Sequence, residues 1–138
     1  MGAWLVDTPL FKMLATSKAK RLLGWCEAND PSLYISAASL THVALAISKL
    51  PMSQSQRASA QHNWLNEIIT RFPDRIHPID AMIATRAGEL LPYLTSSLPL
   101  HRFHDALLVA TAQIPGHGLV TRRADTFGQW TKVPIATV

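Results

Sequence analysis

Short apolar runs alternate with segments of helical periodicity along this chain, and this alternation limits the folds that it can adopt. Strands are predicted at residues 3–6, 32–36, 75–79, 119–121 and 133–137. Helices are predicted between them, at about residues 18–28, 38–50, 57–72, 81–94 and 105–114. Such alternation produces a parallel sheet with helices on both faces. We therefore expect the α/β fold class.

Individual residues set the predicted boundaries. Pro31 and Pro51 each follow a helical segment and stop it. Asp80 is a suitable N-cap for the helix that follows the third strand. The segment 105–114 is apolar on nearly every side, which predicts a buried helix.

Length and composition limit the class of protein. A chain of 138 residues with 48% hydrophobic and 16% charged residues is expected to form one globular domain, residues 1–138. Its net charge of +4 permits nucleic-acid binding without requiring it. The single cysteine, Cys26, excludes an internal disulfide. No apolar run has the length of a membrane span and no signal-peptide pattern opens the chain, so a cytoplasmic location is expected.

Polar residues follow several of the predicted strands. In parallel α/β sheets, functional groups gather beyond the carboxyl ends of the strands. Asp7 follows the first strand, His42 lies in the helix after the second, and Asp105 begins the buried helix. The segment 122–125 follows the fourth strand and contains Asp125. We therefore expect Asp7, His42 and Asp105 to face one shared pocket.

Each of these residues also has a structural interpretation. Asp7 precedes Thr8 and Pro9, the pattern of a helix N-cap with proline in the first turn. Asp105 is a favourable anion near a helix start, His42 fits a hydrogen-bonded structural histidine, and Asp125 fits a turn.

Two aspartates in one pocket require a compensating group. At about 4 Å, two carboxylates repel by about 4 kcal/mol at an effective dielectric constant of about 20. Either one acid is protonated or a cation lies between them. Carboxylate oxygens suit magnesium or manganese, which activate water and neutralise charge on a phosphodiester.

Three stretches carry a family resemblance: "LVDT" near the start, "DALLVATA", and "LVTR" before the last strand. Together they resemble the PIN-domain toxin ribonucleases of the VapC and FitB type, most specifically in "HDALLVATA" followed by "GLVTR". The resemblance extends over nearly the whole chain. It implies a three-layer α/β/α sandwich, a homodimer, an antitoxin protein as partner, and a divalent-metal endoribonuclease that cleaves RNA.

The resemblance also assigns roles to residues. Asp7 matches the first metal-binding acid and Asp105 the third, which makes both of them catalytic. His42 stands where the family has its second acid, usually glutamate. Arg123 stands where Asp or Asn is usual, and Asp125, displaced from that match, is a further candidate metal ligand. The implied metal is magnesium or manganese, with manganese favoured if His42 is a ligand.

Basic groups near the predicted pocket are candidate RNA contacts. They are Arg102, His104, Arg122 and Arg123, which suit phosphate binding. They also fit a rival interpretation, in which a catalytically silent PIN domain binds RNA or a protein partner. A phosphoacceptor receiver domain fits poorly, because such domains need paired acids after the first strand and Asp7 is unpaired.

Overall fold

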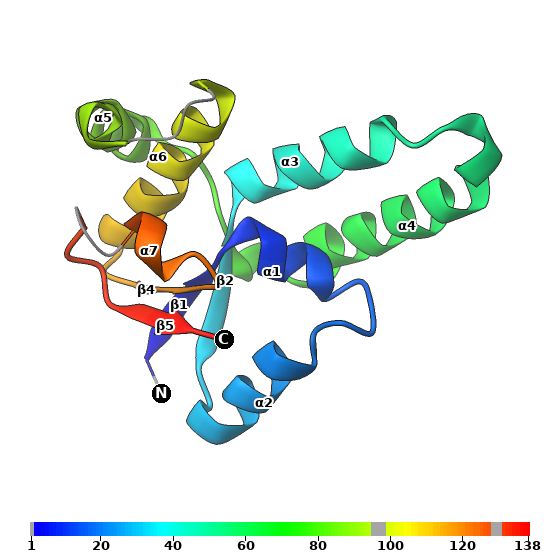
Figure 1. Cartoon of the computed structure of the whole chain (residues 1–138), viewed down its shortest axis with the longest axis horizontal. Coiled ribbons are helices and arrows are strands. Elements are labelled where there is room, and N and C mark those ends of the chain that lie inside the picture. The colour runs from blue at the N-terminus through cyan, green and yellow to red at the C-terminus, as the bar shows by residue number, and fades with distance from the viewer. Residues whose placement is uncertain (1, 95–98, 128–130) are drawn as a thin grey trace.

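The computed structural model describes residues 2–94, 99–127 and 131–138. In these residues five strands form one sheet: β1 (Ala3–Val6), β2 (Ser32–Ser36), β3 (Ile76–His77), β4 (Gly118–Thr121) and β5 (Ile135–Thr137). Their spatial order is β3-β2-β1-β4-β5, and every neighbouring pair is parallel. The predicted parallel sheet is therefore confirmed (Figure 1).

Helices occupy the segments between the strands. The α-helices of the described residues are α1 (Thr8–Met13), α2 (Lys20–Asn29), α3 (Ala37–Ser48), α4 (Ser55–Arg71), α5 (Ala81–Leu90), α6 (Pro99–Gln113) and α7 (Ala124–Phe127). Short 3-10 turns are η1 (Met52–Gln54), η2 (Pro73–Arg75) and η3 (Leu91–Tyr93). Within the described ranges, no helix combines the length and the apolar character that crossing a membrane requires.

Two apolar cores lie on opposite faces of the sheet. Leu5 and Leu119 pack with α5 and α6 on one face, whereas Val6 and Val120 pack with α1, α3 and α4 on the other. This division follows from the strand pleat, which sends successive side chains to opposite faces. The result is the predicted three-layer α/β/α sandwich, in which α3 and α4 lie side by side and extend away from the sheet (Figure 1).

Several predicted boundaries were wrong for identifiable reasons. The helix expected at 105–114 begins at Pro99, because its first turn exposes Leu100 and Phe103 and lacks the apolar pattern of a buried helix. The strand expected at 75–79 is limited to Ile76–His77, since Arg75 ends a 3-10 turn and Pro78 has no N–H to donate. The short helix α7 was not predicted.

The caps predicted from the sequence are confirmed. Asp80 accepts a hydrogen bond from the Ile83 backbone N–H at 2.9 Å and begins α5. Asp7 is the N-cap of α1, with Pro9 in the first turn. Asp7 therefore does have the structural role that its neighbours indicate, and it lies directly at the carboxyl end of β1.

The end of β1 lies where the strand order reverses, that is, where the chain begins to add strands on the other side of β1. From central β1 the chain builds outward through β2 and β3, and then returns to add β4 and β5 on the other side. The switch point therefore lies between the carboxyl ends of β1 and β4, where a crevice is expected. Asp7 follows the first of these strands, and Arg122 and Arg123 follow the second.

Candidate functional site

Asp7 is a fully buried carboxylate at the switch point, with an exposed fraction of 0%. It accepts a hydrogen bond from the Thr8 backbone N–H at 2.8 Å and another from the Thr121 hydroxyl at 2.7 Å. Thr8 is the first residue of α1 and Thr121 is the last residue of β4. The ends of these two elements therefore fix the orientation of the carboxylate. A buried charge of this kind requires a partner of opposite charge.

Arg123 is that partner, and it pairs with Asp105 as well. Its Nε and Nη2 atoms donate to the two carboxylate oxygens of Asp7, each at 2.9 Å. The same Nη2 atom donates to Asp105 at 2.9 Å, and Nη1 donates to the other Asp105 oxygen at 3.3 Å. The cation expected between the two aspartates is therefore the chain's own guanidinium.

The surroundings of Arg123 hold it in this position. Its backbone N–H donates to the Thr121 hydroxyl at 2.8 Å, and its guanidinium lies 4.8 Å from the centre of the Phe127 ring. Burial lowers the pKa of Arg123, but its hydrogen bonds and charge attraction to Asp7 and Asp105 outweigh this and raise the pKa overall. The arginine therefore stays charged.

Asp105 lies on α6 and is less strongly held than Asp7. Burial raises the pKa of the Asp105 carboxyl, and the hydrogen bonds and positive charge of Arg123 act against that rise. Arg123 donates both hydrogen bonds that hold the Asp105 carboxylate within the described part of the chain. Asp105 therefore has one hydrogen-bonding residue, whereas Asp7 has three donor residues.

Two histidines lie beside this trio. The ring centres of His42, on α3, and His104, on α6, are 3.8 Å apart. The Thr8 hydroxyl lies 2.7 Å from His104 Nε2 and 2.7 Å from the Ser39 hydroxyl, which connects α1, α3 and α6. Burial and the neighbouring His42 lower the pKa of His104 to about 4, and burial also lowers the pKa of His42. Both rings are therefore largely neutral near pH 7.

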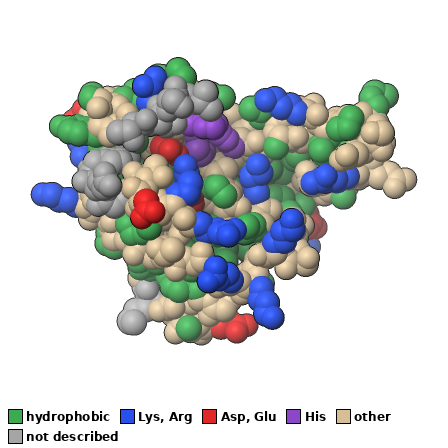
Figure 2. All heavy atoms as spheres, viewed as in Figure 1, with side chains coloured by type: hydrophobic (Ala, Val, Ile, Leu, Met, Phe, Trp, Pro, Cys, Tyr) green, Lys and Arg blue, Asp and Glu red, His purple; other side chains and the backbone are tan. Residues whose placement is uncertain are grey.

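These groups surround one pocket of about 370 Å³. Its lining residues are Thr8, Pro9, Lys12, His42, His101, His104, Asp105 and Arg123. Figure 2 shows histidine side chains gathered in this hollow between α6 and α3, beside acidic and basic groups. His42 and Asp105 face the pocket, and Asp7 lies beneath Arg123. The three residues are therefore at one site, as expected from the sequence.

The donor set does not fit a divalent metal. Both oxygens of each aspartate already accept hydrogen bonds from Arg123, and a guanidinium and a divalent cation would repel each other at this spacing. Within the described ranges, no group of three or more His, Cys, Asp or Glu side chains is arranged to bind a metal ion. The metal-ligand roles of Asp7, Asp105, His42 and Asp125 therefore remain predictions.

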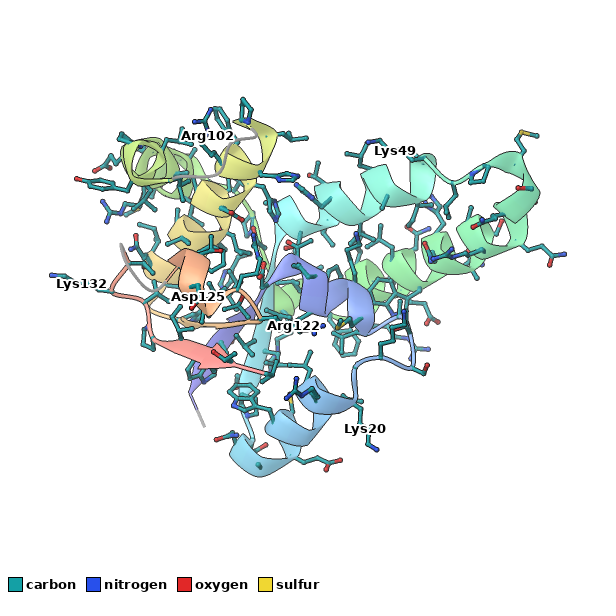
Figure 3. All side chains as sticks on the ribbon, in the orientation of Figure 1. Lys20, Lys49, Arg102, Arg122, Asp125 and Lys132 are labelled. Carbon is teal, nitrogen blue, oxygen red and sulfur yellow. The ribbon has the colours of Figure 1, made fainter. Side chains whose placement is uncertain are left out.

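The other predicted site residues are divided between the pocket and the outer surface. Arg123 and His104 line the pocket, although Arg123 is bound to the acids. Asp125 is exposed on α7. The residues that line the pocket do not include Asp125, Arg102 or Arg122 (Figure 3). Arg122 Nη1 instead lies 3.8 Å from Met13 Sδ.

The sequence reasoning missed Lys12 and His101 in the pocket, and Thr8, Ser39 and Thr121 in its hydrogen-bond network. Helical spacing was an available signal for two of them. Lys12 is four residues after Thr8, and His101 is four residues before Asp105, so each shares a helix face with a residue of the site. No comparable signal identifies Ser39.

We predict that His104 makes the folded state sensitive to acid. Its pKa is lowered from 6.5 to about 4, so the unfolded state binds the proton more readily. The stability present above pH 6.5 should therefore decrease as the pH falls from 6.5 towards 4, by about 3 kcal/mol in total. Urea unfolding of the wild type and of His104→Gln between pH 7 and pH 4.5 measures this dependence.

The glutamine variant should lose less stability than the wild type over that interval. His62→Gln, at an exposed position on α4, is the matched control and should keep the wild-type slope. An equal pH slope for the wild type and for His104→Gln would contradict the prediction.

Comparison with known proteins supports the fold suggested by the sequence resemblance. No protein-family model matches the chain, and no curated protein sequence matches it. Solved structures do match. A structure of FitAB bound to the IR36 DNA fragment matches at a TM-score of 0.75 and 19% identity, over 97% of this chain and 94% of that one.

Two further structures give similar matches. DNA-bound VapBC from Salmonella typhimurium has a TM-score of 0.73 and 18% identity, over 99% of this chain and 98% of that one. A toxin–antitoxin complex from Klebsiella pneumoniae has a TM-score of 0.64 and 27% identity, over 94% and 93% of the two chains. The chain therefore has the PIN-like fold of toxin–antitoxin proteins, as the resemblance indicated.

Proposed function

We propose that this chain is a toxin-type PIN-fold protein that binds RNA through its phosphates without requiring a divalent metal. One observation carries the proposal: Arg123 donates to both Asp7 and Asp105, the two acids that the family resemblance assigns to the metal. Four hydrogen bonds from one guanidinium compete directly with cation binding at these oxygens.

The groups at the rim of the pocket can contact an anionic ligand. Asp7, Asp105 and Arg123 together carry one net negative charge, and Lys12, exposed at the rim, balances it. His42 and His101 add ring N–H groups that can donate to phosphate oxygens. A phosphodiester could therefore bind at the rim through Lys12 and these rings, while Arg123 occupies the carboxylate oxygens that a divalent cation would need. The resemblance to toxin ribonucleases favours RNA as the source of that phosphate.

The metal-dependent endoribonuclease implied by the resemblance is the second candidate. The observation that favours it is that Asp7 and Asp105 lie within hydrogen-bond distance of the same nitrogen, close enough to share a cation. Cleavage with magnesium or manganese would require Arg123 to leave the acids. The catalytic roles of Asp7 and Asp105 depend on that step, and replacement of Arg123 tests it.

A protein partner is also part of the proposal. The structural matches come from toxin–antitoxin complexes, and we infer an antitoxin as the partner of this chain. We further propose a homodimer, formed through large apolar side chains that α5, η3 and α6 expose: Met82, Tyr93, Leu100 and Phe103. Burial of exposed apolar side chains favours association. We expect these assemblies in the cytoplasm.

Binding of a fluorescent single-stranded RNA in EDTA tests the proposed function. We expect saturable binding by fluorescence anisotropy that weakens as salt increases, because phosphate contacts release counterions. Lys12→Ala should weaken binding about threefold to tenfold and reduce the salt dependence. Lys20→Ala removes the same charge from α2, outside the pocket, and is the matched control (Figure 3).

Two results would count against this proposal. RNA binding that appears only when manganese or magnesium is added would favour the metal-dependent candidate. An equal loss of affinity in Lys12→Ala and Lys20→Ala would place the RNA outside the pocket.

A further inference from the structure

A second pair of histidines lies outside the candidate site. His77, the last residue of β3, and His117, in the turn before β4, have their Nε2 atoms 2.8 Å apart. The two residues are half-buried, and neither lines the pocket described above. Residues 40 positions apart in the chain thus direct the same ring atom toward one point.

Tyr34 on β2 holds both rings in place. Its ring stacks on His77 at 4.9 Å with an interplanar angle of 26°, and on His117 at 4.6 Å with an angle of 20°. Arg75 also contacts this cluster: its guanidinium carbon lies 5.1 Å from the centre of the Tyr34 ring. Stacking on Tyr34 therefore holds the two imidazole rings in a fixed orientation.

We propose that His77 and His117 form a binding site for a divalent transition-metal ion of the zinc and nickel class, with water completing the coordination. Two Nε2 atoms that face each other can share either one proton or one metal ion. Imidazole is a preferred ligand of these metals and a poor one for magnesium. With a zinc–nitrogen distance of about 2.05 Å and tetrahedral geometry, the nitrogens would lie about 3.3 Å apart. Metal entry thus requires them to separate by about half an ångström.

The protonation state of the pair supports this site. Burial lowers the pKa of His77, and burial together with the neighbouring His77 lowers the pKa of His117. Both rings are therefore largely neutral near pH 7, which is the form that binds metal. Among the described residues no third His, Cys, Asp or Glu completes a metal-binding group, so the site is a two-histidine site.

The histidines of the candidate pocket are a weaker alternative for such a metal. The Nε2 atom of His104 is 2.7 Å from the Thr8 hydroxyl, and the positive charges of Lys12 and Arg123 face the same cavity. In the cluster of Tyr34, His77 and His117, by contrast, the Nε2 atoms of the two imidazoles face each other, and the cation Arg75 contacts the Tyr34 ring. A metal held there would connect edge strand β3 to the turn before β4 and stabilise the sheet.

Thermal unfolding of the tag-free protein at pH 7.5 tests the site. Zinc or nickel at a concentration about 100 times its Kd should raise the wild-type Tm by about 5–10 °C, whereas magnesium should leave it unchanged. His77→Gln and His117→Gln should each abolish the shift. His62→Gln, exposed on α4, and His42→Gln, in the candidate pocket, should keep it.

A second measurement needs no variant. Nitrogen NMR of the wild-type imidazoles should show zinc-dependent changes at the Nε2 atoms of His77 and His117 and smaller changes at the other histidines. The proposal is overturned if zinc leaves the wild-type Tm unchanged, if the shift survives in His77→Gln, or if the largest NMR changes occur at His42 or His104. RNA binding in EDTA is unaffected by any of these results, so this inference and the proposed function can fail separately.

Discussion

Replacing Arg123 with asparagine should destabilise the protein in metal-free buffer and create a site for manganese or magnesium. The variant leaves Asp7 and Asp105 close together without the cation that now lies between them. Breaking a buried ion pair in this way costs about 3 kcal/mol, the lower end of the usual range, because the Arg123 side chain is 32% exposed. Urea unfolding in EDTA measures this loss.

The same variant should recover stability when a divalent cation is supplied. Manganese would replace the lost positive charge between carboxylate oxygens that suit it, and calorimetry should detect about one ion per chain. The wild type should bind far more weakly, because Arg123 competes for the same oxygens.

The neighbouring residue offers a matched control. Arg122→Asn removes the same charge from an exposed side chain that contacts Met13, and it should change stability by less than about 0.5 kcal/mol. Equal manganese affinity in the wild type and in Arg123→Asn would refute the idea that Arg123 blocks metal binding to Asp7 and Asp105. Gain of RNA cleavage in the variant would show that the metal-dependent chemistry is latent in this fold.

Asp7→Asn is expected to have the other large effect, a loss of about 3–5 kcal/mol in the free energy of unfolding. The side chain is completely buried and accepts hydrogen bonds from Thr8, Thr121 and Arg123. The neutral amide removes one of the two negative charges paired with Arg123 and directs an N–H group toward a donor. Chemical unfolding measures the change directly.

Two related variants make the Asp7 result interpretable. Asp105→Asn should cost less, because burial already raises the pKa of that carboxyl and, among the described residues, Arg123 alone donates hydrogen bonds to it. Asp125→Asn, on the exposed surface of α7, should change stability by less than about 0.5 kcal/mol. If Asp7→Asn cost no more than Asp125→Asn, the structural importance of the buried acid would be disproved.

The fold was predictable because it depends on patterns that repeat over many residues. The alternation of strands and helices determines a parallel sheet, and Leu5 beside Val6 illustrates how one strand supplies both cores. The boundaries of single elements were harder to predict. Leu100 and Phe103 are exposed in the first turns of α6, so the apolar pattern of a buried helix begins only after the true start of that helix. Pro78 similarly ends β3 after His77, although the apolar residues around it predict a strand that continues to residue 79.

The site was predictable in position but not in its electrostatics. Asp7 and Asp105 could be placed together because each has a defined relation to the sheet edge. Arg122 and Arg123 are adjacent and chemically identical, yet one contacts Met13 at the surface and the other lies between two acids. Only the path of the backbone after β4, fixed by the bond from the Arg123 N–H to Thr121, decides which arginine turns inward.

The shared pairing of Asp7, Asp105 and Arg123 also restricts how this sequence can evolve. Losing Asp7 removes the buried carboxylate to which Thr8, Thr121 and Arg123 donate, and losing the guanidinium leaves two acids that repel each other. In a lineage that exchanged a metal ion for an arginine, single substitutions in this trio would therefore lower the stability of the fold. Reversal would be easiest in a cell rich in manganese, where the ion could occupy the position between the acids as soon as the arginine was lost.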